Sequence, residues 1–228
     1  MSYDFDWAML VRAWPYLFEG LKMTALLVIV AMIAGIALGT GLAIVRIYSK
    51  GFIAAIAAAY VNVFRSIPLI LTILWFYFLM PPVIRFITQD ANFSVGPIYA
   101  ALAAFVLAES AYYCEIIRAG IASVAPAQMQ AAQSLGMTRW QALRAIVLPQ
   151  AFRNMTPSLI NQTIALLKDT SLVYVISLND FLGAATKIGQ RDGRVVEVYL
   201  FVALVYFVLC TTGALLVTRL QRSRLSSV

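Results

Sequence analysis

The sequence has no histidine and only two cysteines, so the side chains that most zinc sites use are scarce. Cys114 and Cys210 both lie in apolar stretches, where a cysteine usually behaves as a small buried hydrophobic residue. The phosphate-binding pattern G-x-x-x-x-G-K-[ST] is also absent, so we expect that this chain does not hydrolyse ATP itself. We therefore predict no catalytic residues, no metal site and no cofactor bound by this chain.

Charged residues are scarce as well, at 12% of the chain against 62% hydrophobic residues. A soluble domain carries roughly 25% charged residues and under about half apolar ones. A globular core cannot bury this excess, and so large an apolar surface would aggregate in water. The basic residues behind the net charge of +7 are scattered rather than gathered on one face, which argues against nucleic-acid binding. The composition predicts a membrane protein surrounded by lipid.

Several apolar runs are long enough to cross a bilayer, which takes about 20 residues. We expect about five transmembrane helices in an all-α, polytopic membrane protein. Pro68 lies inside the second run, where a proline removes a helical hydrogen bond and favours a kink. Gly35, Gly39 and Gly41 in the first run would let another helix approach closely. The expected spans are 23–45, about 52–80, about 97–119, about 154–177 and 198–218.

Acidic residues are missing from every second connecting segment, and this sets the expected orientation. If the N-terminus lies outside, the inside segments hold only basic residues, namely Arg46, Lys50, Arg139, Arg144, Arg153, Arg219, Arg222 and Arg224. The acidic residues outside are then Asp4, Asp6, Glu19, Asp90, Asp180, Asp192 and Glu197. The positive-inside rule thus favours an outside N-terminus and a cytoplasmic C-terminus. Because the first residues are acidic, we expect no cleavable signal peptide.

A short polar segment, 126–149, separates the third and fourth spans and has the signals of a helical hairpin. Pro126 suits the first turn of a helix, where its missing N–H costs nothing. Gly136 suits the left-handed position that ends a helix. Thr138 and Gln141 have the spacing of a capping box that starts a second helix. The segment is predicted to lie in the cytoplasm.

Pro149 is expected to stop the second helix of this hairpin, because it pushes Leu148 away from helical geometry. The local chemistry thus predicts helix, tight turn, helix and stop. Two interpretations fit this pattern equally well. The hairpin is either an ordinary connector between membrane helices or a docking element for a cytoplasmic partner.

The spacing within this hairpin resembles the cytoplasmic signature loop of bacterial ABC-transporter permeases. That loop has Glu-Ala-Ala, three residues, Gly, nine residues and Ile-x-Leu-Pro, and this sequence fits it without a gap. Gln130 stands where the family usually has glutamate, so a salt bridge at that position is not expected. The resemblance implies that the loop couples the chain to an ATPase through Gln130, Ala131, Ala132, Gly136, Ile146, Leu148 and Pro149.

Three further segments, 60–71, 111–121 and 166–178, resemble the polar amino-acid uptake branch of these permeases, most like glutamate/aspartate permease subunits. The resemblance implies a type I importer-like transmembrane domain over residues 20–220. A periplasmic segment, 1–19, would precede it, and a cytoplasmic tail, 221–228, would follow. The chain would then lie in the bacterial inner (cytoplasmic) membrane.

The same resemblance implies a permease subunit of an ATP-driven amino-acid importer, with glutamate or aspartate as substrate. Its expected partners are cytoplasmic ATP-binding subunits that hold ATP and Mg, a second permease subunit that is homologous or identical, and a periplasmic or surface solute-binding protein. A permease for glutamine, arginine, histidine or another polar amino acid is the first alternative. A stand-alone channel or secondary transporter is the alternative from another class, although no internal repeat of the kind common in secondary carriers is visible.

Ionisable residues at membrane depth are costly in lipid and usually face a bundle interior, a water path or each other. Arg65 can clamp a carboxylate, Lys168 can add a second positive charge and Glu109 can meet an ammonium group. At ~1.5 Å per residue, Arg65 and Glu109 lie roughly 20 Å and 15 Å from the cytoplasmic ends of their spans, so they can share a depth. The candidate substrate path consists of Arg65, Ser66, Glu109, Lys168, Asp169, Thr170 and Ser171.

Interhelical structural pairing is the alternative role for these charges. Glu115 and Arg118 are three residues apart on one helix face, and we interpret them as a structural pair near the start of the cytoplasmic loop.

Overall fold

The computed structural model describes residues 5–90, 92 and 94–225, and within them every regular element is helical. The first four residues of the expected periplasmic segment and the last three of the expected tail lie outside these described residues. The helices are α1 (Ala8–Tyr48), α2 (Phe52–Ser66), α3 (Leu69–Thr88), α4 (Pro97–Ala122), α5 (Pro126–Ser134), α6 (Arg139–Ala142), α7 (Leu148–Asp169), α8 (Phe181–Asp192) and α9 (Val195–Leu225). A π turn, Leu143–Val147, joins α6 to α7, and a 3-10 segment, Thr170–Ile176, follows α7.

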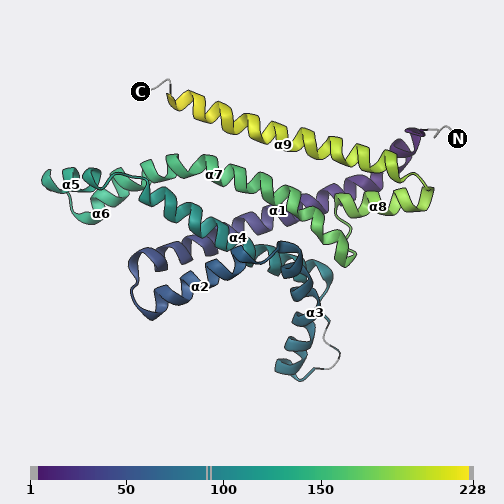
Figure 1. Ribbon diagram of the computed structural model, residues 1–228, viewed down its shortest axis with the longest axis horizontal. Coiled ribbons are helices and arrows are strands. Elements are labelled where there is room, and N and C mark those ends of the chain that lie inside the picture. Colours follow the sequence, from purple (N-terminus) through teal and green to yellow (C-terminus); the bar gives the residue numbers. More distant parts are fainter. Residues whose placement is uncertain (1–4, 91, 93, 226–228) are drawn as a thin grey trace.

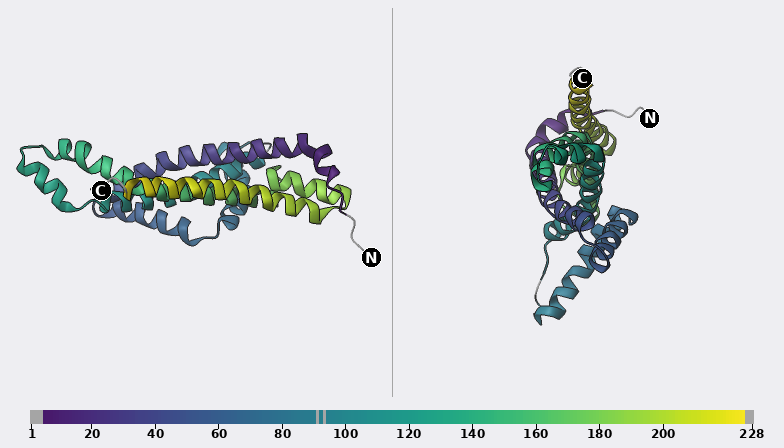
Figure 2. Two further views of the ribbon diagram at one scale, coloured as in Figure 1. Left: turned by 90° about the horizontal axis from the view of Figure 1, so that it is seen from above. Right: turned by 90° about the vertical axis from the view of Figure 1, so that its left-hand side faces the viewer.

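The molecule is an elongated helical bundle with a small hairpin at one end. Figure 1 shows α1, α4, α7 and α9 running along the long axis, with α5 and α6 at one end and α8 at the other. Figure 1 and the right-hand view of Figure 2 show α3 leaving the bundle sideways. Four helices in the described residues are long and apolar enough to cross a membrane, namely α1, α3, α4 and α9.

The bundle is built on a close contact between α1 and α4. A Cβ added at Gly35 would lie 3.1 Å from the Cβ of Glu109, and one at Gly39 would lie 2.8 Å from the backbone oxygen of Ser110. Larger side chains at these two positions would therefore push the helices apart. Gly41 has open space around its Cβ position, so the close approach expected for the three glycines holds for two of them.

The apolar core lies where α1, α3 and α4 meet the end of α7. One buried cluster fills this region, and its fully buried members include Leu27, Ile73, Phe105 and Leu166. Within lipid, close packing rather than transfer out of water is what holds such residues together. Large exposed apolar side chains cover the outer faces of α1, α3 and α9, as lipid contact requires.

The expected second span, 52–80, is divided into α2 and α3 rather than kinked. Ile67 leaves helical geometry with φ −94° and ψ 132°, because Pro68 clashes with a helical residue before it. The chain then turns away and α3 begins a new direction (Figure 1). The expected fourth span, 154–177, lies in α7 and the 3-10 segment, and α7 is not among the four helices that meet the length and hydropathy criteria.

The prediction that Pro149 stops the second hairpin helix is wrong. Leu148 has helical angles of φ −62° and ψ −43°, and the chain stays helical from Arg139 to Asp169. The reason is the π turn just before the proline, in which the Leu148 N–H donates to the carbonyl oxygen of Leu143. This wider turn moves the carbonyl that a proline ring would otherwise strike, so Pro149 sits in the first turn of α7.

Candidate coupling hairpin and polar residues of the bundle

The tip of the α5–α6 hairpin has a fixed shape. Gly136 has φ +84°, and the Met137 N–H donates to the Ala132 carbonyl oxygen at 3.1 Å, which closes the C-terminus of α5. The Gln141 N–H donates to the Thr138 hydroxyl at 3.2 Å, and the Thr138 N–H donates to the Gln141 side-chain oxygen at 2.8 Å. The predicted left-handed glycine and capping box are both confirmed, and so is the start of α5 at Pro126.

Large apolar side chains stand exposed at this tip. Leu135 is 85% exposed and Trp140 is 66% exposed, so the tip presents an apolar patch. They line a shallow groove together with Met137, Gln141 and Arg144. An apolar surface with a basic edge, held on a rigid turn, is typical of a protein docking site.

The residues of the signature pattern take different positions in the hairpin. Ala132 is buried against the rest of the hairpin, whereas Gln130 and Ala131 are exposed beside it. Ile146 is half-buried within the π turn, and Leu148 and Pro149 are exposed at the start of α7. The pattern therefore combines one packing residue with a row of accessible ones.

The base of the hairpin is packed onto the two helices that it joins. Val124, Val147 and Ala151 are buried together, with Met129 and Leu143 against them. The Asn154 amide also donates to the Ser123 hydroxyl at 2.8 Å, which ties α7 to the end of α4. The hairpin is thus joined to α4 and α7 by packed contacts rather than by a loose loop.

Glu109 lies deep in the bundle, where α4, α7 and α1 meet. Its side chain is 1% exposed, and both carboxylate oxygens accept hydrogen bonds from the Gln162 amide, at 3.2 and 3.1 Å. One turn along α4, the Tyr113 hydroxyl lies 3.4 Å from the Thr163 hydroxyl. These contacts make a polar strip between α4 and α7 in an otherwise apolar interior.

Arg65, at the end of α2, approaches Glu115 rather than Glu109. Its guanidinium lies 3.8 Å from the Glu115 carboxylate and 5.8 Å from the centre of the Tyr112 ring. The predicted shared depth of Arg65 and Glu109 assumed that each helix runs straight across the membrane. The structure does not bring these two residues together. Ser66 is exposed beside Arg65.

Glu115 forms ion pairs with more residues than its predicted partner Arg118. The pair with Arg118 is confirmed, with two guanidinium contacts at 3.0 and 2.7 Å. Arg46, from the end of α1, also forms an ion pair with Glu115. In the sequence, Arg46 counts only among the basic residues of the cytoplasmic side. Its contact with Glu115 could not be predicted, because the two residues are far apart in the sequence.

The polar residues at the end of α7 mostly serve the helix terminus. The Thr170 hydroxyl donates to the Leu167 carbonyl oxygen and the Ser171 hydroxyl donates to the Lys168 carbonyl oxygen, both at 2.7 Å. Lys168 is exposed and Asp169 is half-buried. The predicted path residues therefore fall into three groups, one at Arg65, one at Glu109 and one at 168–171.

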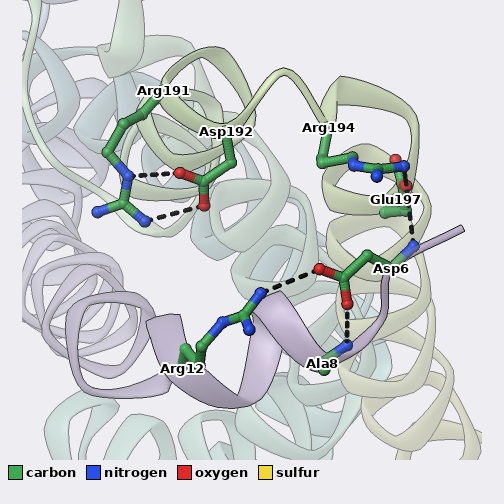
Figure 3. A network of polar contacts seen from close by, with 7 residues as sticks. All are labelled: Asp6, Ala8, Arg12, Arg191, Asp192, Arg194 and Glu197. Atoms are coloured by element: carbon green, nitrogen blue, oxygen red, sulfur yellow. Dashed lines mark hydrogen bonds and ion pairs between the residues drawn. The ribbon is translucent and has the colours of Figure 1, made fainter.

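A separate polar network closes the opposite end of the bundle, as Figure 3 shows. The Asp6 N–H donates to Glu197 at 3.4 Å, and Arg12 contacts the Asp6 carboxylate at 3.0 Å. Arg194 lies 3.4 Å from the same Glu197, which is fully buried. The network fastens the start of α1 to the start of α9.

The exposed ion pair beside this network is formed by adjacent residues of α8. The Arg191 guanidinium contacts both oxygens of Asp192, at 2.7 and 2.9 Å. Its hydrogen bonds hold the pKa of Asp192 below the usual value of an aspartate. The polar segment 189–194 therefore holds one internal ion pair, and its second arginine, Arg194, pairs with Glu197 outside it.

Comparison with protein families finds one that covers most of the chain. Residues 31–226 match the family described as binding-protein-dependent transport system inner membrane component. The glutamate/aspartate import permease protein GltK of Escherichia coli O6:H1 is 48% identical over 220 residues, which cover 96% of this chain and 98% of that protein. The arginine transport system permease protein ArtQ of Bacillus subtilis is 34% identical, over 90% of this chain and 91% of that protein.

Solved structures of transporters share the fold. The crystal structure of an amino acid ABC transporter with histidines contains a chain that is 33% identical, with a TM-score of 0.86, and the match covers 97% of this chain and 100% of that one. An inward-facing structure of the MetNI methionine ABC transporter matches with a TM-score of 0.67 at 19% identity, over 95% of this chain and 99% of that one. Because its identity is only 19%, the similarity to the methionine transporter supports a shared fold and nothing more.

Proposed function

Because the chain belongs to the family of binding-protein-dependent transport system inner membrane components, we propose that it is the membrane permease subunit of an ATP-driven amino-acid importer. The α5–α6 hairpin carries this proposal most directly. It presents exposed Leu135 and Trp140 on a rigid turn and is packed at its base onto α4 and α7. A hairpin built in this way could transmit the movement of a bound partner protein to the membrane helices α4 and α7.

Glutamate and aspartate are the proposed substrates. The relative at 48% identity is a glutamate/aspartate import permease, and the similarity extends over nearly the whole of both chains. The arginine permease at 34% identity is a more distant relative. The signature residues are proposed to form the ATPase coupling loop, in which buried Ala132 packs behind the others, namely Gln130, Ala131, Gly136, Ile146, Leu148 and Pro149.

The proposed partners follow from the family and from the shape of the chain. Cytoplasmic ATP-binding subunits, which bind ATP and Mg, would take the hairpin, and a solute-binding protein would deliver substrate at the opposite end. A second permease subunit, identical or homologous, would complete the path. In the proposed arrangement the N-terminus would lie outside and the C-terminus in the cytoplasm, with residues 20–220 as the transmembrane domain between segments 1–19 and 221–228.

The buried polar groups between α4 and α7 are proposed to belong to the substrate path. Glu109 is the strongest candidate, because its buried carboxylate accepts from the Gln162 amide and forms no ion pair with any residue that the structure describes. An incoming ammonium group would supply that charge. Lys168, Asp169, Thr170 and Ser171 would form the outer part of the path and Arg65 and Ser66 the inner part.

Uptake competition in reconstituted vesicles tests the substrate. The vesicles contain this chain, its permease partner, the ATP-binding subunits and the solute-binding protein, and uptake of radiolabelled L-glutamate is measured against an excess of each common amino acid. We expect L-glutamate and L-aspartate to compete far more strongly than L-glutamine or L-arginine. Stronger competition by L-arginine or L-glutamine would assign the chain to another polar amino acid.

A further inference from the structure

Three arginines surround one glutamate in the half of the bundle nearest the hairpin. Arg46 and Arg118 form ion pairs with Glu115, and Arg65 approaches the same carboxylate at 3.8 Å. Three positive charges therefore share one negative charge. Because the Arg65 and Arg118 side chains are partly exposed, this excess positive charge attracts an anion from the adjoining water.

Arg65 is the loosest member of this cluster. Arg118 holds Glu115 through two contacts at 3.0 and 2.7 Å, and the Arg46 side chain is only 16% exposed. The Arg65 side chain is 42% exposed, and 3.8 Å is too long for a hydrogen bond. Its planar guanidinium is thus well placed to take a carboxylate from outside while Glu115 keeps its other two partners.

A hollow of about 440 Å³ opens beside Arg65 and Glu115. Its polar lining comes from both connected helices, with Ser123 after α4 and Asn154 and Ser158 on α7. This volume falls in the range of small-molecule sites, which is about 300–1,000 Å³. The floor is rigid, because Gly120 packs so closely on Met155 that an added Cβ would lie 2.7 Å from the Met155 Cβ.

We propose that this hollow binds an acidic amino acid on the cytoplasmic side of the substrate path. One carboxylate of the ligand meets Arg65, its ammonium group meets Glu115, and the second carboxylate accepts from the Ser158 hydroxyl and from the Asn154 amide N–H that does not bond Ser123. A ligand with two negative charges and one positive charge reduces the excess positive charge of the cluster. The site rests on the proposed function, and it adds where the released substrate is held.

The position of the hollow also suits release. The Asn154–Ser123 hydrogen bond spans the end of α4 and the first turns of α7, just where the hairpin base is packed. A movement of the hairpin would change the separation of these helices and hence the shape of the hollow. The site would therefore be emptied by the same element that receives the movement of the ATPase.

Equilibrium binding to the whole complex tests the site. The permease with its partner permease and ATP-binding subunits is placed in phosphatidylcholine nanodiscs without ATP or solute-binding protein, and binding of tritiated L-glutamate is measured. We expect Arg65→Gln to weaken binding about tenfold or more, the loss of one charge-assisted hydrogen-bonded contact, and Arg65→Lys to weaken it less. Arg191→Gln, a surface arginine at the opposite end, is the matched control and should bind as the wild type does.

Competitors identify the chemistry of the ligand. L-Aspartate should displace the label well, and L-glutamine, which lacks the second carboxylate, should need at least about tenfold more. Unchanged binding by Arg65→Gln, or equal displacement by L-glutamine, would overturn the proposal. Equal displacement by inorganic phosphate, or loss of binding when phosphatidylglycerol is added to the discs, would make this an anion or lipid-headgroup site instead. ATP-driven uptake of L-glutamate by the same wild-type complex separates these outcomes from a failure of the proposed function.

Discussion

Gly136 fixes the direction of the hairpin through its backbone alone. Its φ of +84° lies in the left-handed region, and nothing lies within 4 Å of an added Cβ. A side chain there would not clash, so the cost of a substitution is conformational, about 1–3 kcal/mol for a residue other than glycine. The turn is therefore expected to change shape before the chain unfolds.

Replacing Gly136 by valine should uncouple transport from ATP hydrolysis. A β-branched residue resists the left-handed conformation most strongly, and the exposed tip formed by Leu135 and Trp140 would be displaced. We expect substrate-stimulated ATPase activity to fall severalfold while membrane insertion stays normal. Gly136→Asn, which tolerates this conformation better, is the control and should keep most of the activity. Full stimulation in Gly136→Val would exclude a docking role for this turn.

Glu109 and Gln162 allow a structural role to be separated from a transport role. Glu109→Ala leaves the half-buried Gln162 amide without this partner, which costs up to about 1–3 kcal/mol. Glu109→Gln keeps the size and an oxygen acceptor, so its thermal stability should stay close to that of the wild type. If Glu109 meets the substrate ammonium group, uptake of L-glutamate should fall more than tenfold in both variants. Normal uptake by Glu109→Gln would leave Glu109 with a structural role only.

Among the helices, α8 has an acidic N-cap that is sensitive to pH. Asp180 is fully buried and accepts the Gly183 N–H at 2.8 Å and the Leu182 N–H at 3.2 Å. Burial raises the pKa of Asp180 from its ordinary value of 3.8 to about 6, in spite of these hydrogen bonds. The folded chain therefore binds the proton more tightly than the unfolded chain does.

The stability of the wild type should accordingly decrease as pH rises from about 4 to about 6, relative to Asp180→Asn. The protonated carboxyl favours the folded state below this range, and that contribution is lost once the folded chain ionises. Asparagine caps a helix without ionising, so it removes the pH dependence but keeps the cap. Thermal unfolding in detergent at several pH values measures the difference. Parallel curves for the two proteins would show that Asp180 is not held at a raised pKa.

The π turn before Pro149 sets the register between the hairpin and α7. In Pro149→Ala the chain can return to regular α-helical bonding through Leu143–Val147. Loss of the π turn would shift the helical register by about one residue and so rotate the hairpin by roughly 100° relative to α7. We expect the variant to be at least as stable as the wild type in thermal unfolding, yet to lose substrate-stimulated ATPase activity. Retained stimulation would mean that the register of this turn does not matter for coupling.

Helix ends were the part of the fold that the sequence predicted best. Pro126, Gly136 and the Thr138–Gln141 box act through neighbours within a few residues, so their signals are visible in the sequence. Pro149 follows a local rule too, but the π turn that overrides it depends on packing of the hairpin base. The break at Pro68 was underestimated for a related reason, since only the surrounding helices decide whether a proline kinks a helix or ends it.

For the molecule as a whole, composition predicted an all-helical membrane protein, and the signature spacing indicated the family before any contact was known. The polar interior could not be predicted in the same way. Glu115 was paired with Arg118 from their spacing on one helix, whereas Arg46 and Arg65 reach it from helices far away in the sequence. Contacts of that kind depend on helix tilt and on the side-chain directions, which no local pattern contains.

ATP-driven accumulation of L-glutamate is the property that distinguishes an importer subunit from a channel or a secondary transporter. It is measured in sealed vesicles containing the chain with its permease partner, ATP-binding subunits and solute-binding protein, with ATP or a non-hydrolysable ATP analogue on the side of the hairpin. We predict that L-glutamate accumulates against its gradient with ATP and not with the analogue. Equal uptake with the analogue, or uptake by the chain without ATP-binding subunits, would contradict the proposed function.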